Sequence, residues 1–287
     1  MTRRTLAAPA TIAGVGVFTG ARASLTIAPA PPGAGITLHA PGWPAPCPAT
    51  LANRRDAAPH PAFAQLPPRC TAVGPDRSPP VFTTEHALGA LAGLGITDAA
   101  LSLDAPELPI DDGSARAFVD AILAAGVRDL DAAIDPVRVH ETLVVESGPA
   151  RLTIEPSDTP HYEYRLDYGP DAPMPPQSAV WSGDPDDFAT NVAPARTFSL
   201  AREVEQMRAL GLFRQFTPRD LLVIDDAGHP IDNAWRFPDE PARHKLLDLI
   251  GDLALLGAPL CARITADRSG HALNHAAARA IADHLAS

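Results

Sequence analysis

A histidine and an aspartate four residues apart form the first pattern in this sequence that could do chemistry. They are His244 and Asp248, and Asp252 follows after the same interval. On a helix, residues four apart lie on one face, so the imidazole and the carboxylate could converge on one cation. The alternative is a helix that presents a polar stripe to solvent, and the spacing alone does not separate the two.

Three further ionisable residues extend the pattern. Glu85 and His86 are adjacent at the start of a predicted helix, where the helix dipole favours negative charge. With His244 and Asp248 they have the composition of a catalytic zinc site that keeps an open position for water and has a general base beside it. His271 adds an imidazole just before the last predicted helix. Taken singly, each also fits a solvated helix face or a loop histidine.

The elements that must hold these residues follow one order in the first half of the chain. Short β-prone runs separated by glycine and proline turns come first, then a helix that Thr83 or Thr84 could cap and that stops at Gly93 and Gly95. A strand and a second helix follow. The predicted strands are 11–17, 24–28, 35–39 and 99–103, and the second helix is 115–125.

A similar order recurs after an Asp-rich connection at 128–135. The fold class is therefore predicted as α+β, with two domains of similar topology at 1–130 and 131–287. A Pro/Asp-rich segment, 169–185, is predicted to be an insertion or a mobile loop. The predicted strands of this half are 137–145, 152–155, 162–167 and 221–224, and the helices are 200–210, 244–256 and 272–285.

Composition excludes some classes of function. The net charge of −11 argues against a nucleic-acid binder, because neutralising phosphates requires a basic surface. No run approaches the roughly 18 apolar residues of a membrane span. The three cysteines, without C-x-x-C spacing, predict neither a disulfide framework nor a thiolate zinc site, and they fit a cytoplasmic protein.

The N-terminus has two interpretations. Arg3 and Arg4 precede a mostly apolar run to Phe18, which resembles a secretory or twin-arginine signal. Gly14 and Gly16 interrupt that run, and the alternation at 24–27 favours a hairpin that belongs to the fold.

Short motifs occur along nearly the whole chain. One contains His244, Lys245 and Asp248, and the others are 14–20 (GVGVFTG), 84–86 (TEH), 90–96 (ALAGLGI), 109–114 (PIDDGS), 195–198 (ARTF), 239–240 (DE), 250–253 (IGDL) and 269–274 (SGHALN). In their order and spacing, these motifs resemble the UDP-3-O-acyl-N-acetylglucosamine deacetylase family of the lipid A pathway.

The resemblance implies two α+β domains with the active site between them, and a zinc-dependent deacetylase. It implies that the zinc ligands are His86, His244 and Asp248, with Fe²⁺ as an alternative ion for such a set. It further implies Glu85 as the base and His271 as the general acid or oxyanion-stabilising cation. The remaining implied roles are an oxyanion hydrogen bond from Thr197, orientation of His271 by Asp252, and substrate binding by Lys245 and Phe198.

Three departures from the family pattern bear on substrate. Phe18 stands where the family usually has histidine, and the segment 215–220 (QFTPRD) replaces a Gly-Gly-Ser loop. Bulky Phe216 and rigid Pro218 predict a different wall beside the substrate passage. The segment 169–185, at the position of the family's acyl-chain insertion, is poor in aliphatic residues.

Two functions therefore follow as expectations. One is the lipid A pathway enzyme, acting on a small-molecule acylated nucleotide sugar in the cytoplasm, with peripheral contact to membrane lipid left open. The other is a paralogous zinc deacetylase acting on a different N-acetylated sugar or glycolipid. A third class is a non-catalytic zinc-dependent binding protein, and only an activity assay that shows turnover would exclude it. Acyl-chain length and oligomeric state do not follow from the sequence.

Overall fold

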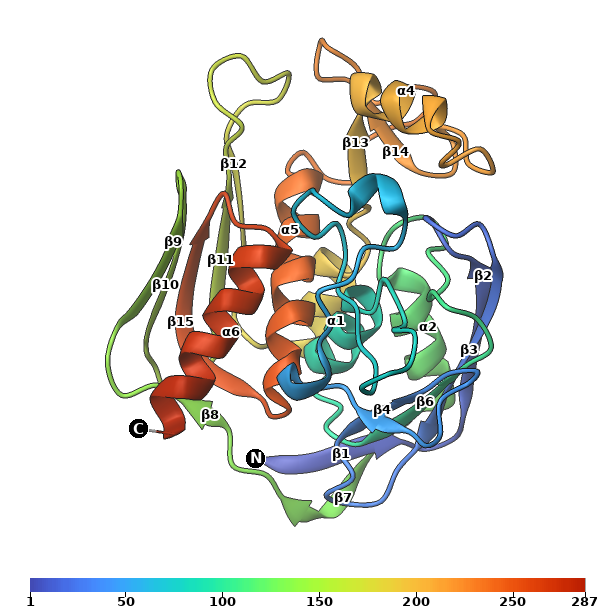
Figure 1. Cartoon of the computed structure of the whole chain (residues 1–287). Helices are drawn as coiled ribbons and strands as arrows, with labels where there is room; N and C mark the ends of the chain where they lie inside the picture. The colour runs from blue at the N-terminus through green and yellow to red at the C-terminus, as the bar shows by residue number, and fades with distance from the viewer. Residues whose placement is uncertain (287) are drawn as a thin grey trace.

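The two halves of the chain repeat one strand order. The computed structural model describes residues 1–286, and its two largest sheets are mixed, one with five strands and one with six (Figure 1). The first sheet has the order β2–β3–β6–β4–β5. Five strands of the second have the order β9–β10–β15–β11–β12, and its sixth strand, β8, pairs with β15 beside this path. In both, the first hairpin is antiparallel, the fourth strand runs parallel to the third, and the last pair is antiparallel. This correspondence is the two-domain α+β fold that the sequence predicts.

The bounds of these strands differ little from the predicted ones in the first half. The first sheet consists of β2 (Ala10–Val15), β3 (Arg22–Pro29), β4 (Ile36–His39), β5 (Cys47–Pro48) and β6 (Ala99–Leu103). The second consists of β8 (Val137–Arg138), β9 (Leu143–Ser147), β10 (Ala150–Pro156), β11 (His161–Leu166), β12 (Gln177–Trp181) and β15 (Leu260–Asp267).

Helices from both halves pack between the two sheets. In the first half α1 (Glu85–Gly93) precedes β6 and α2 (Arg116–Ala125) follows it. In the second half α5 (Glu240–Leu253) and α6 (His271–Ala286) flank β15 in the same way. Figure 1 shows α1 and α5 side by side at the centre, and both helices are almost wholly buried. The centre of the molecule is therefore a contact between equivalent helices.

Several predicted elements are wrong. The connection 128–135 is largely a strand, β7 (Val127–Ala133), which pairs with β1 (Thr2–Leu6). The predicted strand 137–145 is two strands, because β8 (Val137–Arg138) pairs with β15 whereas β9 pairs with β10. The segment 169–185 contains β12, so only its first part is a loop. β15, the buried central strand of the second sheet, was not predicted.

The division at residue 130 stays a prediction. β7 spans that position and pairs with the first strand of the chain, and the Met1 ammonium donates to Ile134 O at 2.9 Å. Residue 287, the last of the predicted second domain, lies outside the described residues. Within residues 1–286, no helix has both the length and the apolar character needed to cross a membrane.

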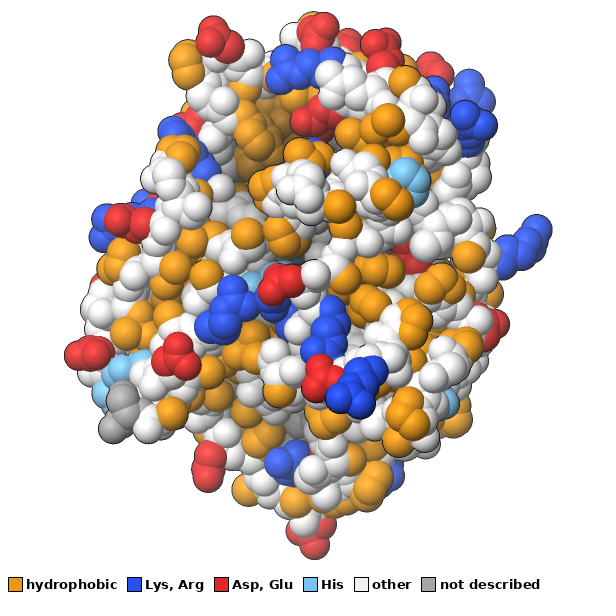
Figure 2. Space-filling view, in the orientation of Figure 1, with side chains coloured by type: hydrophobic (Ala, Val, Ile, Leu, Met, Phe, Trp, Pro, Cys, Tyr) orange, Lys and Arg blue, Asp and Glu red, His pale blue; other side chains and the backbone are white. Residues whose placement is uncertain are grey.

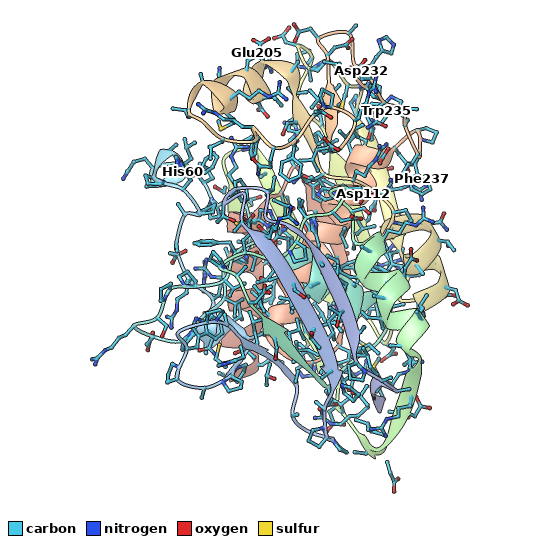
Figure 3. The ribbon with its side chains drawn as sticks, turned by 90° about the vertical axis from the view of Figure 1, so that its right-hand side faces the viewer. His60, Asp112, Glu205, Asp232, Trp235 and Phe237 are labelled. Atoms are coloured by element: carbon cyan, nitrogen blue, oxygen red, sulfur yellow. The ribbon has the colours of Figure 1, made fainter. Side chains whose placement is uncertain are left out.

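A small unit stands above the helices at the top of Figure 1. It is formed by β13 (Phe198–Leu200), α4 (Ala201–Ala209) and β14 (Leu222–Ile224), and we call it the cap. β13 and β14 are parallel, and α4 has no buried residue. The chain then returns to α5 past Asp232, Trp235 and Phe237, which Figure 3 shows above and beside Asp112. Arg236 on this return forms an ion pair with Asp112 at 2.5 Å.

Candidate metal centre and active site

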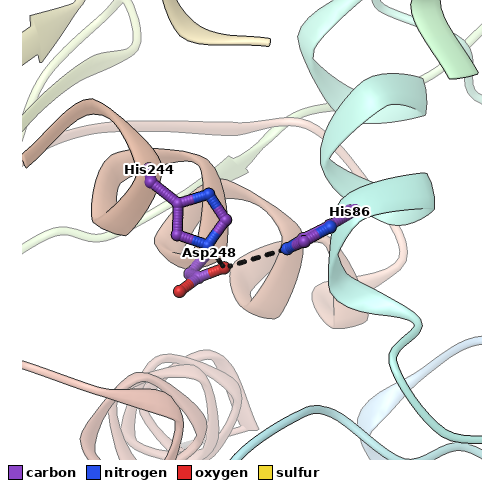
Figure 4. Close-up of side chains that lie close together, drawn as sticks. All are labelled: His86, His244 and Asp248. Atoms are coloured by element: carbon purple, nitrogen blue, oxygen red, sulfur yellow. Dashed lines mark ion pairs between the residues drawn. The ribbon is translucent and has the colours of Figure 1, made fainter. Parts of the chain in front are cut away.

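Three side chains converge where α1 packs against α5. His86 comes from the first turn of α1, and His244 and Asp248 come from successive turns of α5 (Figure 4). One ligand atom from each lies within 4.8 Å of the other two, and all three residues are buried. Asp248 Oδ1 is 3.6 Å from His86 Nε2 and 3.4 Å from His244 Nε2.

The chemistry of these atoms fits a cation. His244 Nδ1 donates to Ala195 O at 3.1 Å, because a carbonyl oxygen can only accept, and burial lowers the pKa of His244 to about 3. The imidazole is therefore neutral, and its Nε2 lone pair faces Asp248 Oδ1, a buried oxygen without a hydrogen-bond partner. Two facing acceptors are unfavourable unless a positive ion lies between them.

The spacing of the atoms also agrees with a metal site. Tetrahedral ligands at about 2.0–2.1 Å from zinc lie roughly 3.3–3.5 Å from one another, close to the separations around Asp248 Oδ1. The other oxygen, Oδ2, accepts from Lys245 Nζ at 2.8 Å. Burial raises the pKa of Asp248, but the Lys245 ammonium outweighs it and holds the pKa well below its usual range. The carboxylate is thus ionised, as a ligand must be.

Glycines allow the two helices to approach closely at this site. A Cβ atom at Gly251 would lie 2.1 Å from the backbone oxygen of Glu85, and one at Gly89 would lie 2.8 Å from Leu247 Cδ1. Gly89 and Gly251 each follow a proposed ligand by three residues, so they set the distance between the ligand-bearing turns.

Glu85 lies beside the metal ligands in a fully buried position. Its Oε2 accepts the backbone N–H of Thr71 at 2.8 Å. Burial raises the pKa of Glu85, although the nearby His271 and His86 oppose that rise. A carboxylate with a raised pKa is suited to accept a proton near neutral pH.

The predicted side-chain cap of α1 is wrong in detail. Thr84 occupies the cap position, but its hydroxyl donates to Thr71 O at 3.1 Å and not to the helix.

His271 forms a buried pair with Asp252. Its Nδ1 lies 2.9 Å from Asp252 Oδ2, and its Nε2 faces Asp248 Oδ2 at 4.0 Å. Burial alone lowers the pKa of His271, but Asp252 outweighs it and raises the pKa to about 9. His271 is therefore cationic at neutral pH and can donate a proton from Nε2.

Lys245 lies beside the proposed metal ligands. The resemblance implies substrate binding by this residue, and here its ammonium pairs with Asp248 at 2.8 Å. The side chain is 23% exposed. Burial lowers its pKa, but Asp248 and two tyrosines more than compensate, so the pKa is raised and the ammonium stays charged.

One pocket joins these residues to the cap. Every predicted site residue except Asp252 lines it, including Thr197 and Phe198 at the start of β13. The Thr197 backbone N–H donates to Gly113 O at 2.7 Å, which ties this wall to the first half. Beneath the cap the lining turns apolar, with Val204, Met207 and Phe213. Figure 2 shows hydrophobic side chains in a hollow at the top of the molecule.

The segment 215–220 contributes to this pocket. Phe216 and Thr217 line it, and Gln215 Nε2 donates to the backbone oxygens of Gly16 and Val17, each at 3.3 Å. The Phe18 ring packs against Phe63 at 5.4 Å and Phe213 at 5.9 Å between centroids. Phe18 and the 215–220 segment, two of the three departures from the family pattern, thus line the same pocket.

Two buried residues at the site were missed in the sequence. Thr71 donates its backbone N–H to Glu85 and its hydroxyl to Asp252. His275 Nε2 lies 2.7 Å from the same hydroxyl. His275 follows His271 by four residues on α6, the spacing that identified His244 and Asp248, so the same rule could have found it. Thr71 carries no comparable signal.

Comparison with known proteins gives one consistent result. The family model "LpxC: UDP-3-O-acyl N-acetylglycosamine deacetylase" matches residues 3–283. Proteins named UDP-3-O-acyl-N-acetylglucosamine deacetylase are similar over nearly the whole chain. The one from Myxococcus xanthus is 35% identical over 285 residues, covering 97% of this chain and 86% of the relative. The one from Anaeromyxobacter sp. is 38% identical (97% and 88%), and the one from Thermosynechococcus vestitus is 38% identical (98% and 94%).

Proposed function

The chain belongs to the UDP-3-O-acyl-N-acetylglucosamine deacetylase family of metal-dependent amide hydrolases, and from this premise we propose that it removes the N-acetyl group of UDP-3-O-acyl-N-acetylglucosamine in lipid A biosynthesis. The observation that carries the proposal is Asp248 Oδ1, which is buried between two histidines and has no hydrogen bond, with Glu85 and His271 in the same pocket.

We propose His86, His244 and Asp248 as the ligands of a Zn²⁺ ion. When bound, such an ion supplies a Lewis acid that lowers the pKa of water and polarises the acetamide carbonyl. Two imidazoles and a carboxylate also suit Fe²⁺. Metal analysis of protein purified with and without oxygen distinguishes the two ions, since Fe²⁺ is lost on oxidation and Zn²⁺ is not.

The other residues carry the proton transfers. Glu85 takes the proton of the water that attacks the carbonyl carbon. Thr197 donates a hydrogen bond to the carbonyl oxygen as negative charge develops there. His271, kept cationic by Asp252, donates its Nε2 proton to the departing nitrogen as the C–N bond breaks. The products are acetate and the free amine of the sugar.

The shape of the pocket supports an acylated substrate. The polar end holds the proposed catalytic groups, and the apolar lining beneath the cap suits a hydrocarbon chain. We propose Phe198 and Lys245 as substrate contacts, Phe198 at the junction of these two regions and Lys245 at the charged end. The three cysteines are free and buried, which supports a reducing, cytoplasmic compartment.

A paralogous deacetylase for another N-acetylated sugar is the second candidate. Phe18 and the 215–220 segment favour it, because Phe18 and Phe216 place bulky side chains in the pocket where the family pattern has histidine and glycines.

Deacetylation assays on two substrates test the proposal. We expect the metal-loaded protein to release acetate from UDP-3-O-acyl-N-acetylglucosamine with a kcat/KM at least a hundredfold above that for N-acetylglucosamine. A preference for the simple sugar supports the paralogue instead. Absence of turnover on both, with the metal bound, supports a binding protein.

A further inference from the structure

A second histidine lies buried behind the proposed general acid. His275 follows His271 by one turn on α6, and only 1% of its surface is exposed. Its Nε2 lies 2.7 Å from Thr71 Oγ1 and 3.4 Å from Asp252 Oδ1. Its Nδ1 lies 3.5 Å from Arg54 Nη1. A buried imidazole with a partner at each nitrogen is held in one orientation.

The hydrogen bonds around His275 run in one direction. Asp252 is ionised and can only accept, so the Thr71 hydroxyl donates its proton to Oδ1. The Thr71 oxygen must then accept from His275 Nε2–H. Arg54 can only donate, so His275 Nδ1 accepts. One neutral tautomer of His275 therefore satisfies every partner, and the donors point from Arg54 through His275 and Thr71 to Asp252.

Thr71 connects this chain to both proposed acid–base groups. Its hydroxyl fixes Oδ1 of Asp252, while Oδ2 accepts from His271 Nδ1 and from Asn274 Nδ2, each at 2.9 Å. Its backbone N–H fixes Glu85 Oε2 at 2.8 Å. Thr71 has no exposed surface, so water cannot replace either bond. One residue thus sets the orientation of the carboxylate behind the acid and of the base.

We propose that His275 and Thr71 are positioning residues for the deacetylation, acting through Asp252 on His271 and, in the case of Thr71, also on Glu85. The inference rests on the proposed function. Neither residue lines the pocket, so neither contacts substrate. His275 holds the Thr71 hydroxyl in the rotamer that donates to Asp252, and Asp252 then holds the His271 ring with Nε2 toward the reacting nitrogen.

Paired substitutions separate positioning from core packing. His275→Leu is apolar and close in volume, so it preserves packing but removes the donor to Thr71. His275→Gln keeps an N–H donor near the position of Nε2. We expect His275→Leu to lower kcat about tenfold with KM and metal content unchanged, and His275→Gln to retain kcat within about threefold. Thr71→Val and Thr71→Ser form the equivalent pair, with the backbone N–H to Glu85 kept in both.

A double variant tests whether His275 acts through Thr71. Because His275 acts through Thr71, adding His275→Leu to Thr71→Val should lower kcat no further than Thr71→Val does alone. Full kcat in both His275→Leu and Thr71→Val overturns the inference, as does a loss in His275→Gln equal to that in His275→Leu. These comparisons require wild-type protein that has measurable deacetylase activity. A metal-loaded wild type without deacetylase activity overturns the proposed function and the inference together.

Discussion

The two oxygens of Asp248 lie in different surroundings, and this difference defines the proposed metal site. Oδ2 is neutralised by Lys245, whereas Oδ1 has no hydrogen bond and faces two imidazoles. A carboxylate in a purely structural ion pair would have both oxygens satisfied. The oxygen without a hydrogen bond is therefore the residue-scale sign of a cation site.

Substitutions at the site should separate ligands from proton carriers. His244→Ala should lose both metal and activity, because it removes a proposed ligand. Glu85→Gln and His271→Gln should keep the metal but lower kcat by a factor on the order of 10² or more. Metal analysis and steady-state kinetics on the same samples measure both effects. Equal loss of metal in all three variants would mean that Glu85 and His271 are ligands or structural residues.

Lys245 offers a test of substrate charge. Lys245→Met removes the ammonium from the pocket, so we expect KM for the UDP-linked substrate to rise about tenfold and the wild-type kcat/KM to fall as salt screens the contact. KM for N-acetylglucosamine should not change. Arg243→Met is a control for loss of a positive charge on the same helix, since Arg243 lies two residues before Lys245 on α5 but pairs with Asp239 and does not line the pocket. An unchanged KM for both substrates would favour an uncharged natural substrate.

The candidate residues were accessible from the sequence because their identities and helical spacing carry the chemistry. The spacing of four identifies His244 and Asp248. Glu85, His86 and His271 stand out by residue type at the starts of predicted helices, and the resemblance assigns their roles. The pairing of Lys245 with Asp248 was not accessible, because spacing alone cannot tell whether a long side chain turns toward its own helix or toward solvent. Thr71 was missed because it acts through contacts with residues far away in sequence.

At the scale of elements, the crossing of α1 and α5 depends on Gly251. Gly251→Ala would place a Cβ atom 2.1 Å from the backbone oxygen of Glu85, which cannot rotate away. We expect the free energy of unfolding to fall by about 3 kcal/mol, as in overpacked cores, and kcat to fall as Glu85 moves. Gly270→Ala is the control for urea unfolding, since nothing lies within 4 Å of its Cβ position. Equal stability of both variants would contradict the tight crossing.

The second half shows where element prediction failed and why. β15 was missed although buried residues alternate with more exposed ones from Ala262 to Asp267, the pattern that marks a strand. The first half contained the missing information, since a strand, β6, lies between α1 and α2. The similar order of elements in the two halves, applied in full, would have predicted a strand between α5 and α6. β7 was missed for another reason, because its charged sequence resembles a connection and its partner β1 is 120 residues away.

At the scale of the whole molecule, buried carboxylates should set the acid limit of stability. Burial raises the pKa of Asp98, but hydrogen bonds from Thr97, Gly35 and Arg3 outweigh it, so the pKa is lowered. A lowered folded-state pKa gives stability that is complete above the unfolded value of about 3.9 and is lost as pH falls toward the folded value.

We therefore expect urea unfolding to show a falling free energy below about pH 4. Asp98→Asn should be less stable than wild type at pH 6 and should show a shallower decline in acid. Asp158→Asn is a suitable control because its carboxylate is fully exposed. Parallel curves for wild type and Asp98→Asn would show that Asp98 does not contribute to the acid limit.

The proposed ligands come from one helix of each half, so a bound ion would act as a reversible cross-link between them. Its strength depends on the ratio of free ion to dissociation constant, reaching about 4 kcal/mol at a thousandfold excess. Metal supply would then govern how much folded protein survives proteolysis as well as how much is active. A cell short of zinc would lose this activity twice, first through empty sites and then through faster turnover of the chain itself.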